Sequence, residues 1–124
     1  MMTFIIKNLP ILIVITPLMF SLIVAVLSNN RLSWVLSTFA SFITMIFSIL
    51  LCFEVSNDSN ISYYLGNWPP PLGIEYVIDK VSIIPIMIVS IIGFIATLNA
   101  HNFFILEIDK NLVSKTYSLW LLTI

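Results

Sequence analysis

Long apolar stretches separated by short polar breaks dominate the pattern of this chain. They run from Leu9 to Leu27, from Leu32 to Phe53 and from Val81 to Leu98, and none of the three contains an acid, a base or a histidine. About 20 apolar residues cross a hydrocarbon core of roughly 30 Å as a helix. Because lipid offers the backbone no hydrogen-bond partner, a spanning segment of this kind must be helical. The pattern predicts three transmembrane helices.

The connection over residues 54–80 differs from the short break before the second helix. Two β-prone strips, residues 61–65 and 74–78, flank a segment rich in glycine and proline, which is the pattern of a hairpin outside the membrane. Asp79 stands where its carboxylate can cap the third helix. The aromatic side chains expected in the interfacial belt of the membrane are Tyr63, Tyr64, Trp68 and Tyr76.

Polar residues return after the third helix. Residues 99–116 include His101, Glu107 and Lys110, and we predict an interfacial loop in which Glu107 and Lys110 pair. Residues 117–124 are strongly apolar again and predict the start of a fourth helix. Eight helical residues cover about 12 Å, under half of a bilayer. We therefore expect a fourth helix that is cut short, as in a truncated or split gene product.

The composition supports a membrane protein. Of the 124 residues 60% are hydrophobic and 9% are charged, and the mean hydropathy is +1.10. Soluble domains carry about 25% charged residues. Cys52 is the single cysteine, which excludes a disulfide framework or a zinc site within one chain. No basic run could follow a nucleic-acid backbone, so nucleic acid is not an expected partner.

The sequence predicts no catalytic, cofactor-binding or metal-binding residue. Glu54 and Asp79 lie at the ends of predicted helices, and His101 is expected to be a polar flank. No histidine and acid are placed to activate a nucleophile, and no carboxylates cluster for a metal. Serine and threonine within the spans are interpreted as hydroxyls satisfied by their own helix or as contacts between helices. We leave open whether the chain acts in a larger translocase.

Residues 66–82 read GNWPPPLGIEYVIDKVS. They resemble the G-x-W-x-x-P-x-G-I-x-x-x-x-D-x-x-S signature of antiporter-like membrane subunits. This family comprises the D-type subunits of Mrp multisubunit cation/proton antiporters and the homologous proton-pumping subunits of respiratory complex I. Pro70 and Leu72 depart from the residues common there. The matching positions form a structural motif that would shape the hairpin and begin the third helix: Gly66, Trp68, Gly73 and Asp79.

The resemblance implies the N-terminal, peripheral part of a larger protein. In that family, buried glutamate and lysine residues that move protons lie further along the chain, so no catalytic residue is carried over. The expected partners are the lipid bilayer and other membrane subunits of an antiporter or a complex I-like assembly. Two alternatives stay open: a fragment of a membrane subunit of a proton-pumping NADH–quinone oxidoreductase, or a small three-span scaffold or assembly protein.

Lysine and arginine counts predict the orientation in a cell (inner) membrane. Lys7 and Lys80 share one side, and Arg31, Lys110 and Lys115 share the other. The cytoplasmic side carries the excess of these residues. The N-terminus and the loop over residues 54–80 are therefore expected on the outer side.

Overall fold

The computed structural model describes residues 8–27, 29–57, 61–64, 71, 73, 75–109 and 112–124, without the side chains of residues 61, 76 and 105. The predicted fold class, an all-α membrane protein with a hairpin and a short last helix, is confirmed. Along the chain the elements are α2 (Leu9–Val26), α3 (Asn30–Asn57), β1 (Ile61–Tyr64), β2 (Glu75–Ile78), α4 (Ile83–Glu107) and α5 (Val113–Thr123).

Three of these helices are long and apolar enough to cross a membrane. With 18, 28 and 25 residues, α2, α3 and α4 extend over about 27, 42 and 37 Å at a rise of 1.5 Å per residue. The 11 residues of α5 extend over about 16 Å. The chain is thus a multi-pass membrane protein in which α5 is much shorter than its neighbours.

The third spanning helix is longer than the sequence pattern predicts. α4 continues to Glu107, so the predicted interfacial loop over residues 99–116 is wrong for most of its length. The candidate span within α4, Ile83–Phe104, contains His101, which corrects the prediction of a third span free of ionisable groups. No glycine or proline interrupts residues 99–107, and apolar residues resume at Phe103, so the helix continues through a polar turn.

Other helix ends also differ from the predicted ones. α3 ends at Asn57, which places Glu54 inside its last turn. α5 begins at Val113, within the predicted loop. Lys110, the predicted partner of Glu107, lies outside the described residues.

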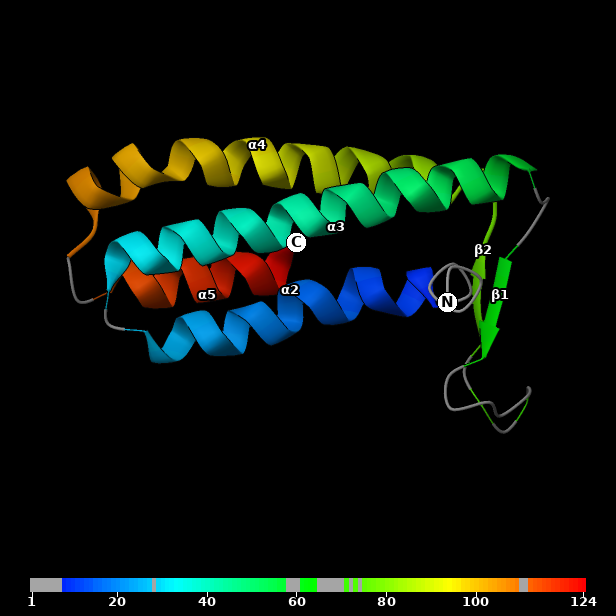
Figure 1. Cartoon of the computed structure of the whole chain (residues 1–124), viewed down its shortest axis with the longest axis horizontal. Helices are drawn as coiled ribbons and strands as arrows, with labels where there is room; N and C mark the ends of the chain where they lie inside the picture. The colour runs from blue at the N-terminus through cyan, green and yellow to red at the C-terminus, as the bar shows by residue number, and fades with distance from the viewer. Residues whose placement is uncertain are drawn as a thin grey trace.

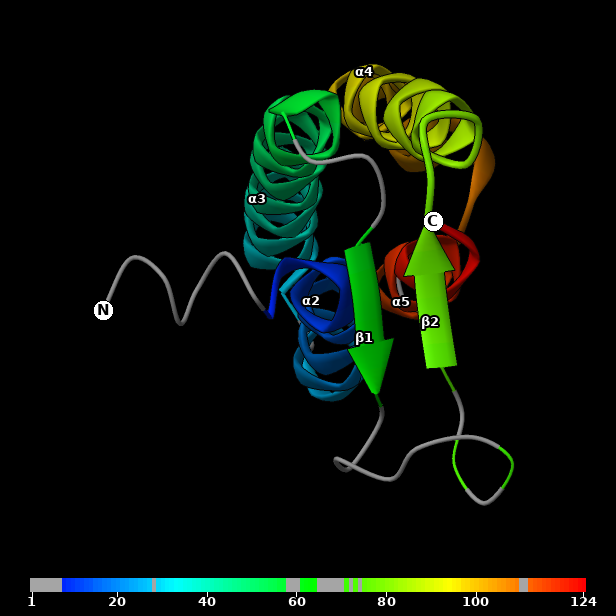
Figure 2. The ribbon, with the colours of Figure 1, turned by 90° about the vertical axis from the view of Figure 1, so that its right-hand side faces the viewer.

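The helices form two layers. Viewed end-on, α3 and α4 lie in one layer and α2 and α5 in the other (Figure 2). α3 packs against α2, α4 and α5, and α2 packs against α5. The end of α2, the start of α3, the end of α4 and the start of α5 lie at one end of the bundle, and the strands β1 and β2 lie at the other (Figure 1).

The predicted hairpin is a two-stranded antiparallel sheet. Ile61 pairs with Ile78, and Tyr64 pairs with Glu75. Of the side chains expected in the aromatic belt, Tyr63 and Tyr64 lie on β1, and Trp68 and the side chain of Tyr76 lie outside the described part.

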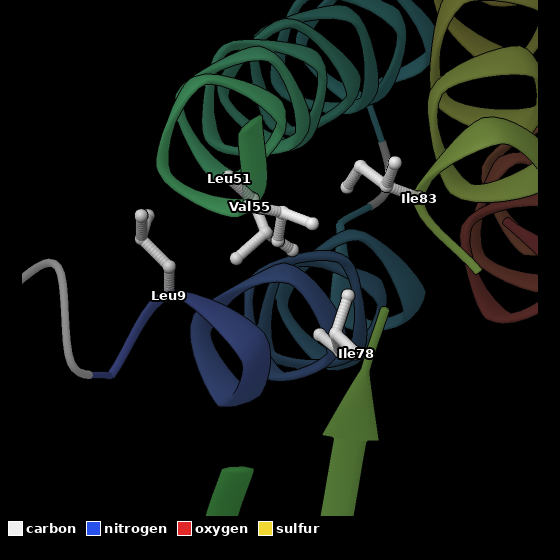
Figure 3. Close-up of a cluster of buried hydrophobic side chains, with 5 residues drawn as sticks. All are labelled: Leu9, Leu51, Val55, Ile78 and Ile83. Atoms are coloured by element: carbon white, nitrogen blue, oxygen red, sulfur yellow. The ribbon is translucent and has the colours of Figure 1, made fainter. Parts of the chain in front are cut away.

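Among the described residues, two clusters of buried apolar side chains hold the bundle. One lies beneath the hairpin and joins the start of α2, the end of α3, β2 and the start of α4 (Figure 3). It consists of Leu9, Leu51, Val55, Ile78 and Ile83. The other cluster surrounds α5 and consists of Val24, Ala40, Val113, Tyr117 and Leu121.

Candidate functional site between the helices

A row of small hydroxyl side chains follows one face of α3. Its members are spaced by four or three residues, which brings them to the same side of a helix. All are buried, at most 3% exposed. In lipid, apolar contact favours no protein neighbour over a lipid tail, so small hydroxyl residues are common where membrane helices meet. The row consists of Ser33, Ser37, Ser41, Thr44 and Ser48.

The first turn of α5 is fixed by Ser114. Its hydroxyl donates to the carbonyl oxygen of Val24 on α2 over 2.7 Å. The same hydroxyl oxygen lies 2.8 Å from the hydroxyl of Ser33 on α3. Ser114 therefore joins α5 to α2 and α3 at one point, although both partner residues lie far from it in the sequence.

A second contact joins α5 to α2 one turn further along. The hydroxyl of Ser21 donates to the carbonyl oxygen of Ser118 over 3.1 Å, and the two hydroxyl oxygens lie 3.2 Å apart. Both residues are buried. With Ser114, this contact restricts the rotation of α5 about its own axis.

Thr97 connects α4 to α3 and α5. Its hydroxyl donates to the carbonyl oxygen of Gly93 over 2.7 Å and accepts from Nε1 of Trp120 over 2.9 Å. Its carbonyl oxygen accepts from Nε1 of Trp34 over 3.1 Å. The hydroxyl of Ser41 lies 3.3 Å from that of Thr97. One fully buried residue thus orients two indole rings from two helices.

The network is built from neutral groups. Four buried oxygens in and beside it have no hydrogen-bond partner among the described residues: Ser37 Oγ, Thr38 Oγ1, Ser48 Oγ and Tyr117 OH. Within the same part of the chain, no group of three or more histidine, cysteine, aspartate or glutamate side chains could hold a metal. Hydroxyls of this kind bind neighbouring helices by hydrogen bonds and carry no charge near neutral pH.

His101 lies beside the network. Its ring is partly buried and stacks on the indole of Trp34, with the ring centres 4.6 Å apart and the planes tilted by 35°. The same indole donates to Thr97. His101 therefore helps to hold Trp34 in place, whereas the sequence predicts only a polar residue beyond the end of the third helix.

Asp79 forms the turn that leads into α4. Its Oδ1 accepts from the hydroxyl of Ser82 over 2.5 Å and from the backbone N–H of Ser82 over 2.8 Å. The N–H of Ile83 donates to the carbonyl oxygen of Asp79 over 3.2 Å. The bonds from Ser82, the hydroxyl first, favour the carboxylate and lower the pKa of Asp79 below its ordinary value of 3.8.

Of the remaining motif residues, the structure describes Gly73, which is not brought to this turn. Gly73 lies in a bend before β2, and Asp79 directly follows β2, so the strand separates them. Gly66 and Trp68 lie outside the described residues. The structural motif that the resemblance implies stays a prediction.

The sequence predicts that serines and threonines in the spans bond to their own helix or to a neighbouring one. It does not predict that these side chains form one connected network. The structure contains both predicted kinds of contact: Thr44 bonds to Ala40 of its own helix, and Ser114 bonds to α2. The spacing of hydroxyls along α3 is the available signal. It identifies a face, but the partners on α2, α4 and α5 do not follow from it.

Comparison with known proteins finds a similarity to an antiporter protein. Over 93 residues, 74% of this chain, the sequence is 33% identical to the protein named "Putative antiporter subunit mnhD2" in two strains of Staphylococcus epidermidis. The chain spans 18% of the length of these curated relatives. No protein-family model and no solved structure matches the chain. It is a multi-pass membrane protein that is similar to part of an antiporter subunit.

Proposed function

We propose that this chain forms the N-terminal, peripheral helices of a membrane protein in a multisubunit cation/proton antiporter of the Mrp D type. The similarity to the Staphylococcus epidermidis antiporter subunit carries this proposal. The signature over residues 66–82 supports the same branch. Other membrane subunits are the partners of such a chain.

Within that assembly, the role of these helices is to hold other helices in position and not to conduct ions. The buried polar contacts that join α5 to α2, α3 and α4 are made by neutral serine, threonine and tryptophan side chains. Groups that move protons or cations through a membrane are ionisable side chains inside the spans. His101, which lies within the candidate span of α4, stacks on Trp34 beside these contacts and makes none of them. The hydroxyl network supports a rigid bundle against which other helices pack.

A chimera tests the antiporter assignment. The segment of the Staphylococcus epidermidis protein that corresponds to the 93 similar residues is replaced by that of this chain. The chimera is expressed with the other antiporter subunits in a host without sodium/proton antiporters of its own. We expect sodium-driven proton movement in inverted membrane vesicles, recorded with a pH-sensitive dye. The control is a replacement of equal composition in shuffled order, which should fail to assemble.

Two results would contradict the proposal. A chimera that reaches the membrane in normal amount with its partner subunits, yet exchanges no sodium for protons, would oppose the antiporter assignment. Sodium-driven proton exchange in proteoliposomes that contain this chain alone would refute the positioning role.

A further inference from the structure

A slot lies between α2 and α4, beyond the end of α5. Because Ser114 contacts Val24 and Ser118 contacts Ser21, α5 runs back along α2 from the end of that helix. Its 11 residues reach about the middle of the bundle (Figure 1). A cavity of about 290 Å³ continues from there toward the hairpin, with α3 as its floor and α2 and α4 as its walls.

Both ends of the slot are closed by protein. At one end lies the side chain of Ile124, which packs on α4 so closely that a Cβ added to Gly93 would lie 3.1 Å from it. At the other end lies Ile78 of β2, which is 1% exposed and belongs to the cluster beneath the hairpin (Figure 3). The floor follows α3 from Thr44 to Leu51, over about 10 Å.

The side of the slot is open. Val14 on α2 and Val89 on α4 line it and are 46 and 49% exposed. The floor and both walls are parts of the three candidate membrane spans, in the half of the bundle nearer the hairpin. The slot therefore opens toward the lipid tails of the leaflet on the hairpin side.

The lining of the slot is suited to an apolar ligand. The hydroxyl of Thr44 donates to the carbonyl oxygen of Ala40, and that of Ser90 donates to the carbonyl oxygen of Met87, each over 3.0 Å. Both donors are thus used within their own helices. The remaining lining residues are aliphatic side chains and prolines. A cavity holds water where two to four polar partners converge, and an apolar cavity binds apolar molecules instead.

We propose that this slot binds one acyl chain of a phospholipid from the leaflet on the hairpin side. The tails of one leaflet extend over about 15 Å, half of the hydrocarbon core. The slot takes the inner part of such a tail, with its terminal methyl group toward Ile124. A helix about 10 Å in diameter would fill about 800 Å³ over the length of the slot, well above the enclosed volume. The site does not depend on the proposed antiporter role.

Native mass spectrometry of the chain released from lipid nanodiscs tests the proposal. We expect one phospholipid to stay bound per chain. Val89→Trp places an indole in the mouth of the slot and should abolish this binding. The matched control is Ile88→Trp, which adds the same group at a neighbouring position that is 51% exposed and does not line the slot. Val14→Trp closes the mouth from α2, and circular dichroism verifies that each variant is folded.

Photolabelling in liposomes locates the bound tail. A phospholipid with a diazirine at the end of one acyl chain should label Thr44 and Ile124 more than Ile88, and Val89→Trp should remove this excess. Loss of all bound lipid from the unchanged chain, equal retention in Val89→Trp and Val14→Trp, or equal labelling of the slot and of Ile88 would overturn the proposal.

Discussion

Tyr117 and Ser114 should respond in opposite directions when their hydroxyls are removed. Both lie buried on α5. The ring of Tyr117 packs against Phe104 with centres 4.9 Å apart, but its hydroxyl has no partner among the described residues. Tyr117→Phe keeps the ring and removes the unpaired group. Because burying an unpaired hydroxyl costs about 1–3 kcal/mol, we expect stabilisation of about 1 kcal/mol.

Ser114→Ala is the matched comparison on the same helix. It removes the bond to Val24 and the contact with Ser33. Hydrogen bonds between membrane helices contribute about 0.6 kcal/mol on average and up to about 1.7. Two such contacts predict a loss of about 1–2 kcal/mol, or roughly fivefold to thirtyfold in the folding equilibrium at 1.4 kcal/mol per factor of ten.

Unfolding by sodium dodecyl sulfate in mixed micelles, followed by far-ultraviolet circular dichroism, measures both free energies. Amide hydrogen exchange in α5 shows whether each change acts where the contacts lie. Destabilisation of Tyr117→Phe by more than about 1 kcal/mol would refute the reasoning, because a hydroxyl can cost that much on removal only when it has a partner. A neutral Ser114→Ala would show that its two contacts do not hold α5.

Three further predictions follow from other contacts. Thr97→Val should loosen Trp120 and shift tryptophan fluorescence to longer wavelength, whereas Thr97→Ser, which keeps the acceptor, should not. Since the folded pKa of Asp79 is lowered, its carboxylate stabilises the turn fully above the ordinary pKa of 3.8, and this contribution is lost as pH falls through the lowered value. Hydrogen exchange at the start of α4 should therefore differ between Asp79→Ala and the unchanged chain near neutral pH, and the difference should shrink as the pH is lowered below 3.8; a difference that is the same at every pH would contradict this. In a Cys52→Ser background, a cysteine in place of Lys80 should react with an impermeant thiol reagent added outside cells, and one in place of Lys115 only after permeabilisation; the reverse pattern would invert the orientation.

The spanning helices and the hairpin could be predicted because their signals are local. An uninterrupted apolar stretch such as Leu9 to Leu27 can cross lipid only as a helix. The structure contains this helix as α2. Alternation on either side of a glycine- and proline-rich segment predicts the strands whose register pairs Ile61 with Ile78. Neither inference requires knowledge of which helices are neighbours.

The end of α4 and the hydroxyl network could not be predicted in this way. Polar residues such as Asn99 and His101 reduce the hydropathy of a segment without breaking a helix, and the stacking of His101 on Trp34 depends on α3. The Ser114 contact joins residues 90 positions apart in sequence. Such pairs are set by the arrangement of helices, which periodicity within one helix does not contain.

The bonds made by Ser114, Ser21 and Thr97 explain why a helix as short as α5 holds a defined place in this bundle. Its apolar side chains gain little from exchanging lipid for protein neighbours, so packing alone would tolerate several rotations of α5. Directional contacts to α2 at two levels, and to α4 through Trp120, satisfy only one rotation. Each contact is weak, and a rotated α5 would lose all three together while burying their polar groups unpaired. The hydroxyl network therefore specifies the position of α5, and apolar packing fills the space that this position leaves.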